Sequence, residues 1–316
     1  MNLAPVVLFV YNRFENTKIL LDSLAKNELA NKSTLYIYAD GVKENVNQAE
    51  LDKIKSVREL IYSYKWCNEV FIIESEKNIG LANSIITGVT DTVNKYGKVI
   101  ILEDDLNLSP YFLTYINDAL DLYREDKRVG QIGSCNFFAN GSKFPSTFFA
   151  PFADCWGWGT WADRWNKYEY DAEKLLSELK ERRLMKKFNL NNNSDMEGML
   201  MAQIKQQFNT WDIQWLAVCV LNNWLTLYPN FSTSQHLYLG SATHNTTNLN
   251  PPLLQKKLEL ETLQPIVLPK ILKAMELGYS GRSDFYGNKL KVQKDSRYFK
   301  NRIRKIATNI KMFFTR

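Results

Sequence analysis

Short apolar runs alternate with helical patterns in the first third of the chain, and this alternation constrains the fold more than any other feature. The apolar runs, rich in β-branched and aromatic residues, are Val6–Tyr11, Thr34–Ala39, Glu69–Ile73 and Lys98–Leu102. The helical patterns between them are Glu15–Ala25, Gln48–Tyr62 and Leu81–Asn94. Short buried strands separated by helices are typical of a parallel, doubly wound sheet. The sequence therefore predicts an α/β fold with a mostly parallel sheet flanked by helices.

The alternation continues past Pro110 for one more helix and strand and ends at Asn136. A helix is predicted at Phe112–Arg124 and a strand around Val129–Ser134, whereas the Gly- and Trp-rich segment Phe148–Trp165 fits neither a regular helix nor a regular strand. Further along, the patterns predict a charged helix, a polar loop, a buried helix, a strand and a second loop, at Lys174–Phe188, Asn189–Asp195, Trp211–Trp224, Leu225–Tyr228 and Leu239–Leu249.

Composition limits the classes of protein to consider. The 316 residues, 45% hydrophobic and 23% charged, suffice for one large α/β domain or two small ones. Four scattered cysteines and two histidines, without metal-ligand spacing, disfavour a disulfide framework and a zinc site. The start MNLAPVVLFVYNR does not resemble a signal peptide, and no stretch approaches the ~20 apolar residues of a membrane-spanning helix. We therefore expect a cytoplasmic protein.

Polar residues follow three of the predicted strands at their carboxyl ends. They are Asn12-Arg13, Asp40 and Glu103-Asp104-Asp105, and the turn Lys77–Gly80 comes shortly after the third strand. Ligands of doubly wound sheets bind beyond the carboxyl ends of the strands. We expect these side chains to converge on one rim. The turn Lys77–Gly80 is either a plain turn or a point of backbone approach to a phosphate or base.

Three consecutive acids after an apolar strand require solvent or a cation. Strand alternation would place Glu103 and Asp105 on one side and Asp104 on the other. Carboxylate oxygens suit Mg²⁺ or Mn²⁺, which keep few protein ligands and add phosphates. The alternative is that these acids precede a helix at Leu106–Pro110 and complement its dipole.

Asp212 lies between two tryptophans at the start of an apolar helix, in the sequence WDIQW. It is equally suited to cap the helix and to serve as a general base whose pKa the aromatic surroundings would raise. His244 stands in a loop of small polar residues, where a lone histidine is more often a surface residue than a metal ligand.

The order of these motifs resembles the inverting GT-A-fold glycosyltransferases. It is most similar to bacterial family-2-like enzymes and to the N-acetylglucosaminyltransferases that start complex N-glycans. The matching segments are VVLFVYNR (Val6–Arg13), Asp40, KNIGLANS (Lys77–Ser84), ILEDD (Ile101–Asp105), CWGWGTW (Cys155–Trp161), TWDIQW (Thr210–Trp215) and GSATHNT (Gly240–Thr246). EDD departs from a strict DxD, as it does in those N-acetylglucosaminyltransferases.

The resemblance implies a role for each matching residue. Asp40 would read a uracil-type base, Asp105 would bind Mn²⁺ or Mg²⁺, and His244 would contact the metal or the diphosphate. Glu103 and Asp104 would hold the ribose and donor sugar, and Asp212 would be the catalytic base. The remaining nucleotide or donor contacts would be Tyr11, Asn12, Arg13, Asn78 and Leu81. The sugar pockets would be shaped by Trp156, Gly157, Trp158 and Trp211.

By this resemblance, residues 1–135 form the nucleotide-sugar-binding half, 136–250 the acceptor and catalytic half of the same GT-A domain, and 251–316 a C-terminal extension. The implied reaction transfers a sugar from a nucleotide diphosphate, UDP-type favoured, to a saccharide or lipid-linked hydroxyl with inversion. A sugar nucleotidyltransferase is the first alternative, but the expected Gly-rich loop is absent, since no glycine lies between Met1 and Asp40. A non-catalytic sugar- or membrane-binding protein on the same scaffold is the second.

The C-terminal tail predicts a basic amphipathic helix. Lys291–Arg316 carries nine Lys or Arg and one Asp, whereas the rest of the chain is slightly acidic. One apolar stripe is formed by Ile303, Ile306, Ile310, Phe313 and Phe314. The basic residues outside it are Arg302, Arg304, Lys305, Lys311 and Arg316. Such a helix suits the inner, anionic face of a membrane. The alternative is packing on the body or on a second subunit. We expect no nucleic-acid binding.

Overall fold

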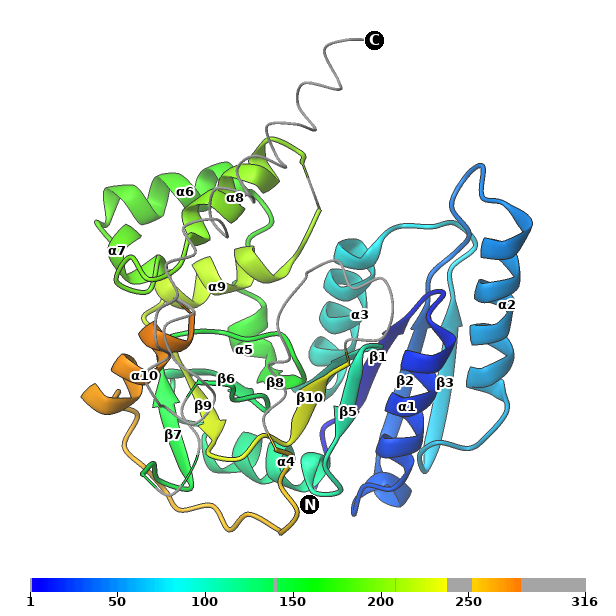
Figure 1. Ribbon diagram of the computed structural model, residues 1–316, viewed down its shortest axis with the longest axis horizontal. Coiled ribbons are helices and arrows are strands. Elements are labelled where there is room, and N and C mark those ends of the chain that lie inside the picture. Colours follow the sequence, from blue (N-terminus) through cyan, green and yellow to red (C-terminus); the bar gives the residue numbers. More distant parts are fainter. Residues whose placement is uncertain (1, 139–140, 142, 208, 238–251, 280–316) are drawn as a thin grey trace, which may run out of the picture.

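An eight-stranded sheet runs through the molecule, with helices on both of its faces (Figure 1). The computed structural model describes residues 2–138, 141, 143–207, 209–237 and 252–279. The strand order is β3-β2-β1-β4-β8-β6-β9-β7, and only β8 and β7 run against the others. The strands are β1 Val6–Val10, β2 Thr34–Ala39, β3 Glu69–Glu74, β4 Lys98–Glu103, β6 Val129–Gly133, β7 Thr147–Ala150, β8 Trp158–Trp161 and β9 Leu225–Pro229. The predicted α/β class is thereby confirmed.

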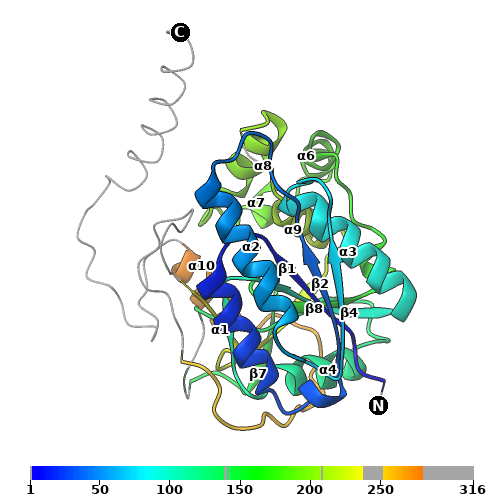
Figure 2. The same cartoon turned by 90° about the vertical axis from the view of Figure 1, so that its right-hand side faces the viewer.

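The helices flank this sheet. Figure 2 shows α1 and α2 on one side of the strands and α3 on the other. Figure 1 shows α6–α9 gathered beside the β6–β9 half. The bounds are α1 Phe14–Ala25, α2 Gln48–Tyr62, α3 Leu81–Tyr96, α4 Phe112–Leu122, α5 Ala162–Trp165, α6 Ala172–Glu181, α7 Met185–Phe188, α8 Met196–Ile204, α9 Asp212–Leu221 and α10 Pro269–Tyr279, with a 3₁₀ turn at Ala30–Lys32. No helix among the described residues is long and apolar enough to cross a membrane.

Alternate side chains of the central strands supply two cores. Val7, Phe9 and Ile101 face α3 and the helices beyond it, whereas Leu8 and Leu102 pack towards α1 and α4. A strand that is covered on both faces reads as a continuous apolar run. For this reason β1 and β4 could be recognised from the sequence.

Four tryptophans form the centre of the larger core. Trp158 of β8 stacks on Trp211, with ring centroids 5.4 Å apart, and also contacts Trp165 and Trp215. Trp158 is completely buried and Trp211 is 2% exposed. These rings join β8 to the start of α9, and so fix where that helix begins relative to the sheet.

The prediction that Phe148–Trp165 is irregular was wrong in part. The segment contains most of β7, all of β8 and α5. Every residue of β8 is buried, so its four-residue sequence WGTW has no alternation of polar and apolar side chains to reveal it. The sequence analysis also missed α8, α10 and a second, two-stranded antiparallel sheet of β5 (Leu106–Leu108) and β10 (Ser234–His236).

One further boundary differs from prediction. The charged helix Lys174–Phe188 is divided into α6 and α7, since Arg183 between them adopts a positive φ of 57°. Residues 252–279 pack on the body, because Ile271 and Met275 of α10 are completely buried in the larger core. The predicted loop Leu239–Leu249 and the basic tail lie outside the described residues.

The tryptophan core predicts a large loss of stability on truncation. We expect Trp158→Ala to lower the free energy of unfolding by about 3–5 kcal/mol, as is typical for removing a buried aromatic ring. Tyr64→Ala, which removes a ring that is 62% exposed, should cost less than about 1 kcal/mol. Urea unfolding of both variants compares them directly. Equal losses would contradict the central place of Trp158 in the core.

Candidate functional site

Asp104 and Asp105 converge on one positive charge at the carboxyl end of β4. The Arg13 Nη1 atom, from the start of α1, lies 3.2 Å from Asp104 Oδ1 and 3.0 Å from Asp105 Oδ2. The two acids were expected on opposite sides, but β4 ends at Glu103 and the chain turns there, so strand alternation no longer applies. The alternative that the acids precede a helix is wrong, because Leu106–Leu108 is strand β5.

Burial and neighbouring charges separate the pKa values of these three acids. Burial raises the pKa of Asp104 to about 7 despite the Arg13 charge. Burial and the charges of Asp105, Asp212 and Asp104 raise the pKa of Glu103 well above its ordinary value. Burial also opposes ionisation of Asp105, but hydrogen bonds from His236 and Arg13 hold its pKa below the ordinary value. Asp105 is therefore the acid of this group that is best held as a carboxylate.

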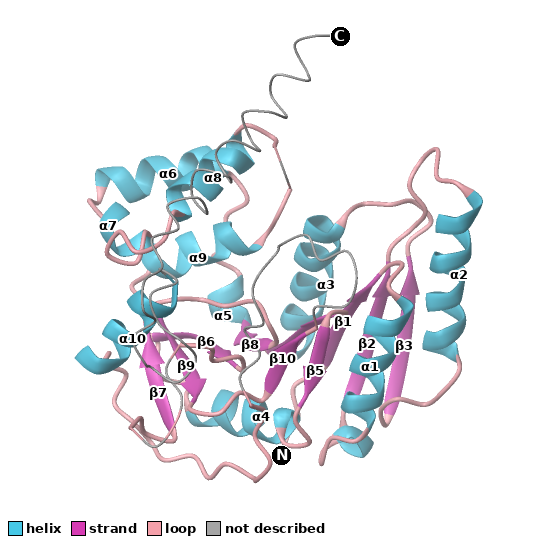
Figure 3. Ribbon diagram, viewed as in Figure 1, coloured by secondary structure: helices cyan, strands magenta, loops and turns pink. Residues whose placement is uncertain are grey.

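His236, which the sequence analysis did not select, lies against Asp105. Strand β10 pairs with β5 in the register His236↔Leu106, beside the main sheet (Figure 3). The backbone N–H of Leu237 donates to the Asp105 carbonyl oxygen at 2.6 Å, and His236 Nε2 lies 3.2 Å from Asp105 Oδ2. No pattern in the sequence indicated this contact, because neither of the two short strands was predicted.

Asp154 is a second residue that the sequence analysis missed. It precedes β8 on the rim, and its Oδ1 accepts a hydrogen bond from the Trp156 backbone N–H at 2.8 Å. Burial, together with the charge of Asp212, raises the pKa of Asp154 to about 7, against the effect of His236. Asp154 is thus close enough to Asp212 and His236 for their charges to change its pKa.

Asp212 is the first residue of α9 rather than its N-cap, which is Trp211. Its Oδ1 accepts hydrogen bonds from the Thr210 hydroxyl and, at 2.8 Å, from the Ile213 backbone N–H. The charge of Asp212 raises the pKa of both Glu103 and Asp154. A carboxylate in the first turn also benefits from the helix dipole. Its position suits both a structural role and a chemical one.

Asp40 holds the turn Lys77–Gly80 against the end of β2. Its two carboxylate oxygens accept from the backbone N–H groups of Gly41, Ile79 and Gly80 and from Asn78 Nδ2, at 2.8–3.0 Å. Gly41 is required here because a Cβ atom would lie 2.3 Å from the Lys77 carbonyl carbon. The prediction that Asp40 and Asn78 belong to one site is consistent with this contact. A base contact from Asp40 would compete with its four present bonds.

The other predicted nucleotide contacts lie at the same end of the sheet. Asn12 donates from Nδ2 to Glu50 Oε1 of α2, and Lys43 Nζ lies 5.6 Å from the centre of the Tyr11 ring. Leu81, the first residue of α3, is 50% exposed. Tyr11, Asn12 and Leu81 therefore lie near the carboxyl ends of the strands, and their contact with a nucleotide stays a prediction.

The predicted sugar-contacting tryptophans differ in accessibility. Trp158 and Trp211 are buried in the core described above, which argues against direct contact with a sugar. Trp156 is only partly buried, and its ring centre lies 5.0 Å from that of His236. Gly157 turns the chain between Trp156 and Trp158, with a φ of 82°. Of the four predicted residues, Trp156 has the side chain that remains suited to a ligand.

The acid pair suits a divalent cation that takes its other ligands from a bound donor and from water. Within the described part of the chain, no three His, Cys, Asp or Glu side chains are close enough to hold a metal. However, oxygens of Asp104 and Asp105 already converge on one positively charged nitrogen, that of Arg13. Mg²⁺ is commonly held by one or two carboxylates, with phosphates and waters as the other ligands. His244, the predicted second ligand, lies outside the described residues.

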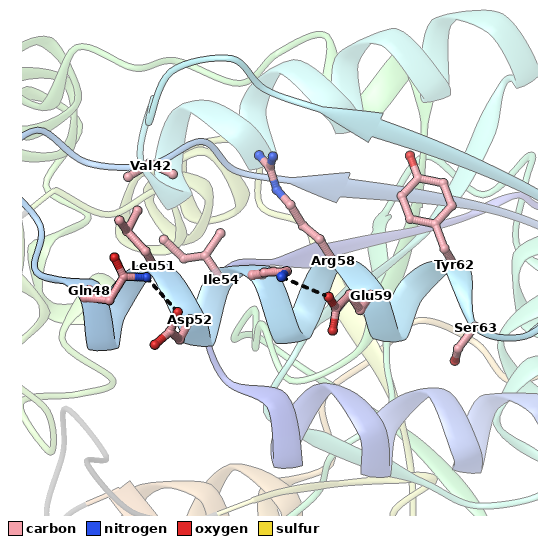
Figure 4. Close-up of a pocket in the computed structure, with 10 residues that line it drawn as sticks. Val42, Gln48, Leu51, Asp52, Ile54, Arg58, Glu59, Tyr62 and Ser63 are labelled. Carbon is pink, nitrogen blue, oxygen red and sulfur yellow. Dashed lines mark hydrogen bonds and ion pairs between the residues drawn. The ribbon is translucent and has the colours of Figure 1, made fainter.

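A separate groove of about 690 Å³ runs along α2 and contains none of these acids. Its lining includes Val42, Leu51, Arg58 and Tyr62, and Figure 4 shows Arg58 reaching from α2 towards the strands. Arg58 Nη1 pairs there with Glu74 Oε2 at 2.8 Å. The groove is thus distinct from the rim where the acids gather.

The chain resembles known proteins in structure at low sequence identity. No family model and no curated protein matches the sequence. Among solved structures, the mannosyltransferase PcManGT from Pyrobaculum calidifontis, in complex with GDP-Man and Mn²⁺, is 12% identical over 51% of this chain and 44% of its own length, with a TM-score of 0.36. TarS from S. aureus is 18% identical over 47% of this chain and 25% of its own length, with a TM-score of 0.29. Coverage and scores this low give neither likeness weight in assigning the site.

Asp154 predicts a specific pH dependence of stability. Because its pKa is raised in the folded state, its contribution to stability is fully present below about pH 4 and is lost as the pH rises through about 7. Asp154→Asn does not titrate. The unfolding free energy of the variant relative to the natural protein should therefore increase by up to about 1.4 kcal/mol per pH unit over this range. Urea unfolding at several pH values measures the difference. Parallel pH profiles would contradict the raised pKa.

Proposed function

We propose that the protein is a glycosyltransferase that moves a sugar from a nucleotide diphosphate to a hydroxyl acceptor with inversion. One observation carries the proposal: carboxylates from three separate segments gather at the rim of the sheet. Asp104 and Asp105 follow β4, Asp154 precedes β8, and Asp212 opens α9. Ligands of open α/β sheets bind at this rim. Separate acids suit the two demands of glycosyl transfer, which are a cation on the diphosphate and a base on the acceptor.

The donor would lie across the ends of β1, β2 and β4. Tyr11 and Asn12 follow β1, and the loop held by Asp40 places Asn78 and Leu81 beside them. A uridine-type base in this region is supported by the motif order of the GT-A family. Asp40 would then contribute mainly by fixing the loop that contacts the nucleotide.

Asp105 would hold Mn²⁺ or Mg²⁺. His236 and, from outside the described residues, His244 are further candidates for the same ion. When bound, the ion supplies positive charge that stabilises the departing diphosphate. Glu103 and Asp104, whose pKa values are raised, would bind donor hydroxyl groups through hydrogen bonds.

Asp212 would take the proton from the acceptor hydroxyl. The hydroxyl oxygen would attack the anomeric carbon at the same time, from the face opposite the diphosphate. Its carboxylate is fixed by Thr210 and by the backbone of Ile213. A base held in this way can be aligned with an incoming hydroxyl at little entropic cost. Trp156, at the edge of the same site, would pack against a sugar ring.

The acceptor is proposed to be a saccharide or a lipid-linked saccharide, as in bacterial surface polysaccharide synthesis. The basic amphipathic tail would then bring the enzyme to an anionic membrane surface. Two alternatives stay open, a sugar nucleotidyltransferase and a non-catalytic sugar-binding protein on this scaffold. Transfer of intact nucleotide monophosphate would indicate the first, and metal-dependent nucleotide binding without turnover would indicate the second.

Replacement of Asp105 tests the metal site. We expect Asp105→Asn to abolish the gain in UDP affinity that Mn²⁺ confers, because the variant loses the carboxylate that is best held in its charged form. Titration calorimetry of UDP with and without Mn²⁺ gives this gain. Asp126→Asn, which removes a surface acid paired with Arg128 at 2.6 Å, is the matched control. An unchanged gain in the Asp105 variant would refute the assignment.

Replacement of Asp212 tests the catalytic base. We expect Asp212→Asn to reduce turnover by at least ~10²-fold with little change in donor affinity, since general-base catalysis typically contributes that much. Nucleotide-sugar screening identifies the donor, and proton NMR of the product gives its anomeric configuration. Near-normal turnover would leave Asp212 with a structural role. A retained configuration would refute direct displacement.

A further inference from the structure

Arg13 occupies a position between Asp104 and Asp105 where a bound cation would also satisfy both acids. A single guanidinium nitrogen, Nη1, lies 3.2 Å from one carboxylate and 3.0 Å from the other. Burial penalises negative charge on these two adjoining carboxyl groups, and the charge of Arg13 offsets part of that penalty at both of them. Arg13, together with His236 at Asp105, therefore supplies the positive charge beside the acids whenever no other cation does so.

The two sides of this contact differ in freedom. The Arg13 side chain is 42% exposed, whereas those of Asp104 and Asp105 are 11% and 18% exposed. The acids are anchored at the end of a buried strand, and the arginine is the N-cap residue that precedes α1. The arginine is thus the partner that can leave without disturbing the sheet.

The remaining donors of Arg13 are uncommitted. Apart from the two contacts of Nη1, the side chain makes no hydrogen bond within the described residues. A guanidinium has five N–H donors arranged as a fork that matches phosphate oxygens. Its Nη2 and Nε groups are accordingly available to an anion that arrives from the solvent side.

We propose that Arg13 is a displaceable counter-ion that couples metal binding to donor binding. Without donor, its guanidinium holds the acid pair and competes with a divalent cation. When the cation arrives with a nucleotide diphosphate, the guanidinium moves from the carboxylates to the phosphates. The cation would then occupy the position at Asp105 that the guanidinium has left. This inference rests on the proposed function, since it requires a metal–diphosphate donor at the rim.

The test measures binding of Mn²⁺ alone, by electron paramagnetic resonance of the free ion. We expect Arg13→Gln to raise Mn²⁺ affinity by at least ~10-fold, the lower end of what one neighbouring charge does to the proton affinity of a carboxylate. The same variant should bind UDP in saturating Mn²⁺ more weakly than the natural protein. The two effects have opposite signs, which a general loss of structure would not produce.

Two further variants sharpen the result. Arg13→Lys keeps the charge but not the fork, so Mn²⁺ affinity should stay low while UDP affinity falls. Arg128→Gln removes a surface arginine that also pairs with an aspartate and should change neither affinity. Unchanged or weaker Mn²⁺ binding in Arg13→Gln, with the Asp105-dependent gain for UDP intact, would overturn the coupling and leave the proposed function standing. Absence of any Mn²⁺ effect on UDP in the natural protein would overturn both.

Discussion

Strand β4 is buried between β1 and β8, and its sequence runs directly from four apolar residues into three acids. Because β4 pairs with both of these strands, the acids at its end are held at a rim of the sheet that is poorly solvated. Desolvation there raises the pKa of Glu103 and Asp104, while partners keep Asp105 charged. Acids with raised and lowered pKa values thus lie side by side, and environment rather than residue type distinguishes them.

The rest of the site is assembled around this strand by contacts between distant segments. Strand β8 pairs with β4 and brings Asp154 to the rim, and its Trp158 stacks on Trp211 to place Asp212. The small sheet of β5 and β10 carries His236 to Asp105. The tryptophan core therefore has a positional consequence: it sets the distance between the start of α9 and the end of β4.

The sequence predicted the elements of the first half of the fold well, and in the second half it predicted β6, α9 and β9 but missed the short strands. The bounds of β2 and α2 were predicted at their observed residues, because buried strands and amphipathic helices have distinct periods. Strand β8 is buried throughout and only four residues long, and β5 and β10 have three residues each, so no period could mark them. Asp154 and His236 were missed for the same reason. They lie close to Asp212 and Asp105 because strands that are distant in the sequence pair with one another. A single sequence does not show which strands pair.

The most direct test of the central claim is anomalous diffraction from crystals grown with Mn²⁺ and UDP. The account predicts one manganese peak within coordination distance of a carboxylate oxygen of Asp105, with the uridine near Tyr11 and Asn78. A manganese peak at another place, or UDP bound at the rim with no metal beside Asp105, would contradict it.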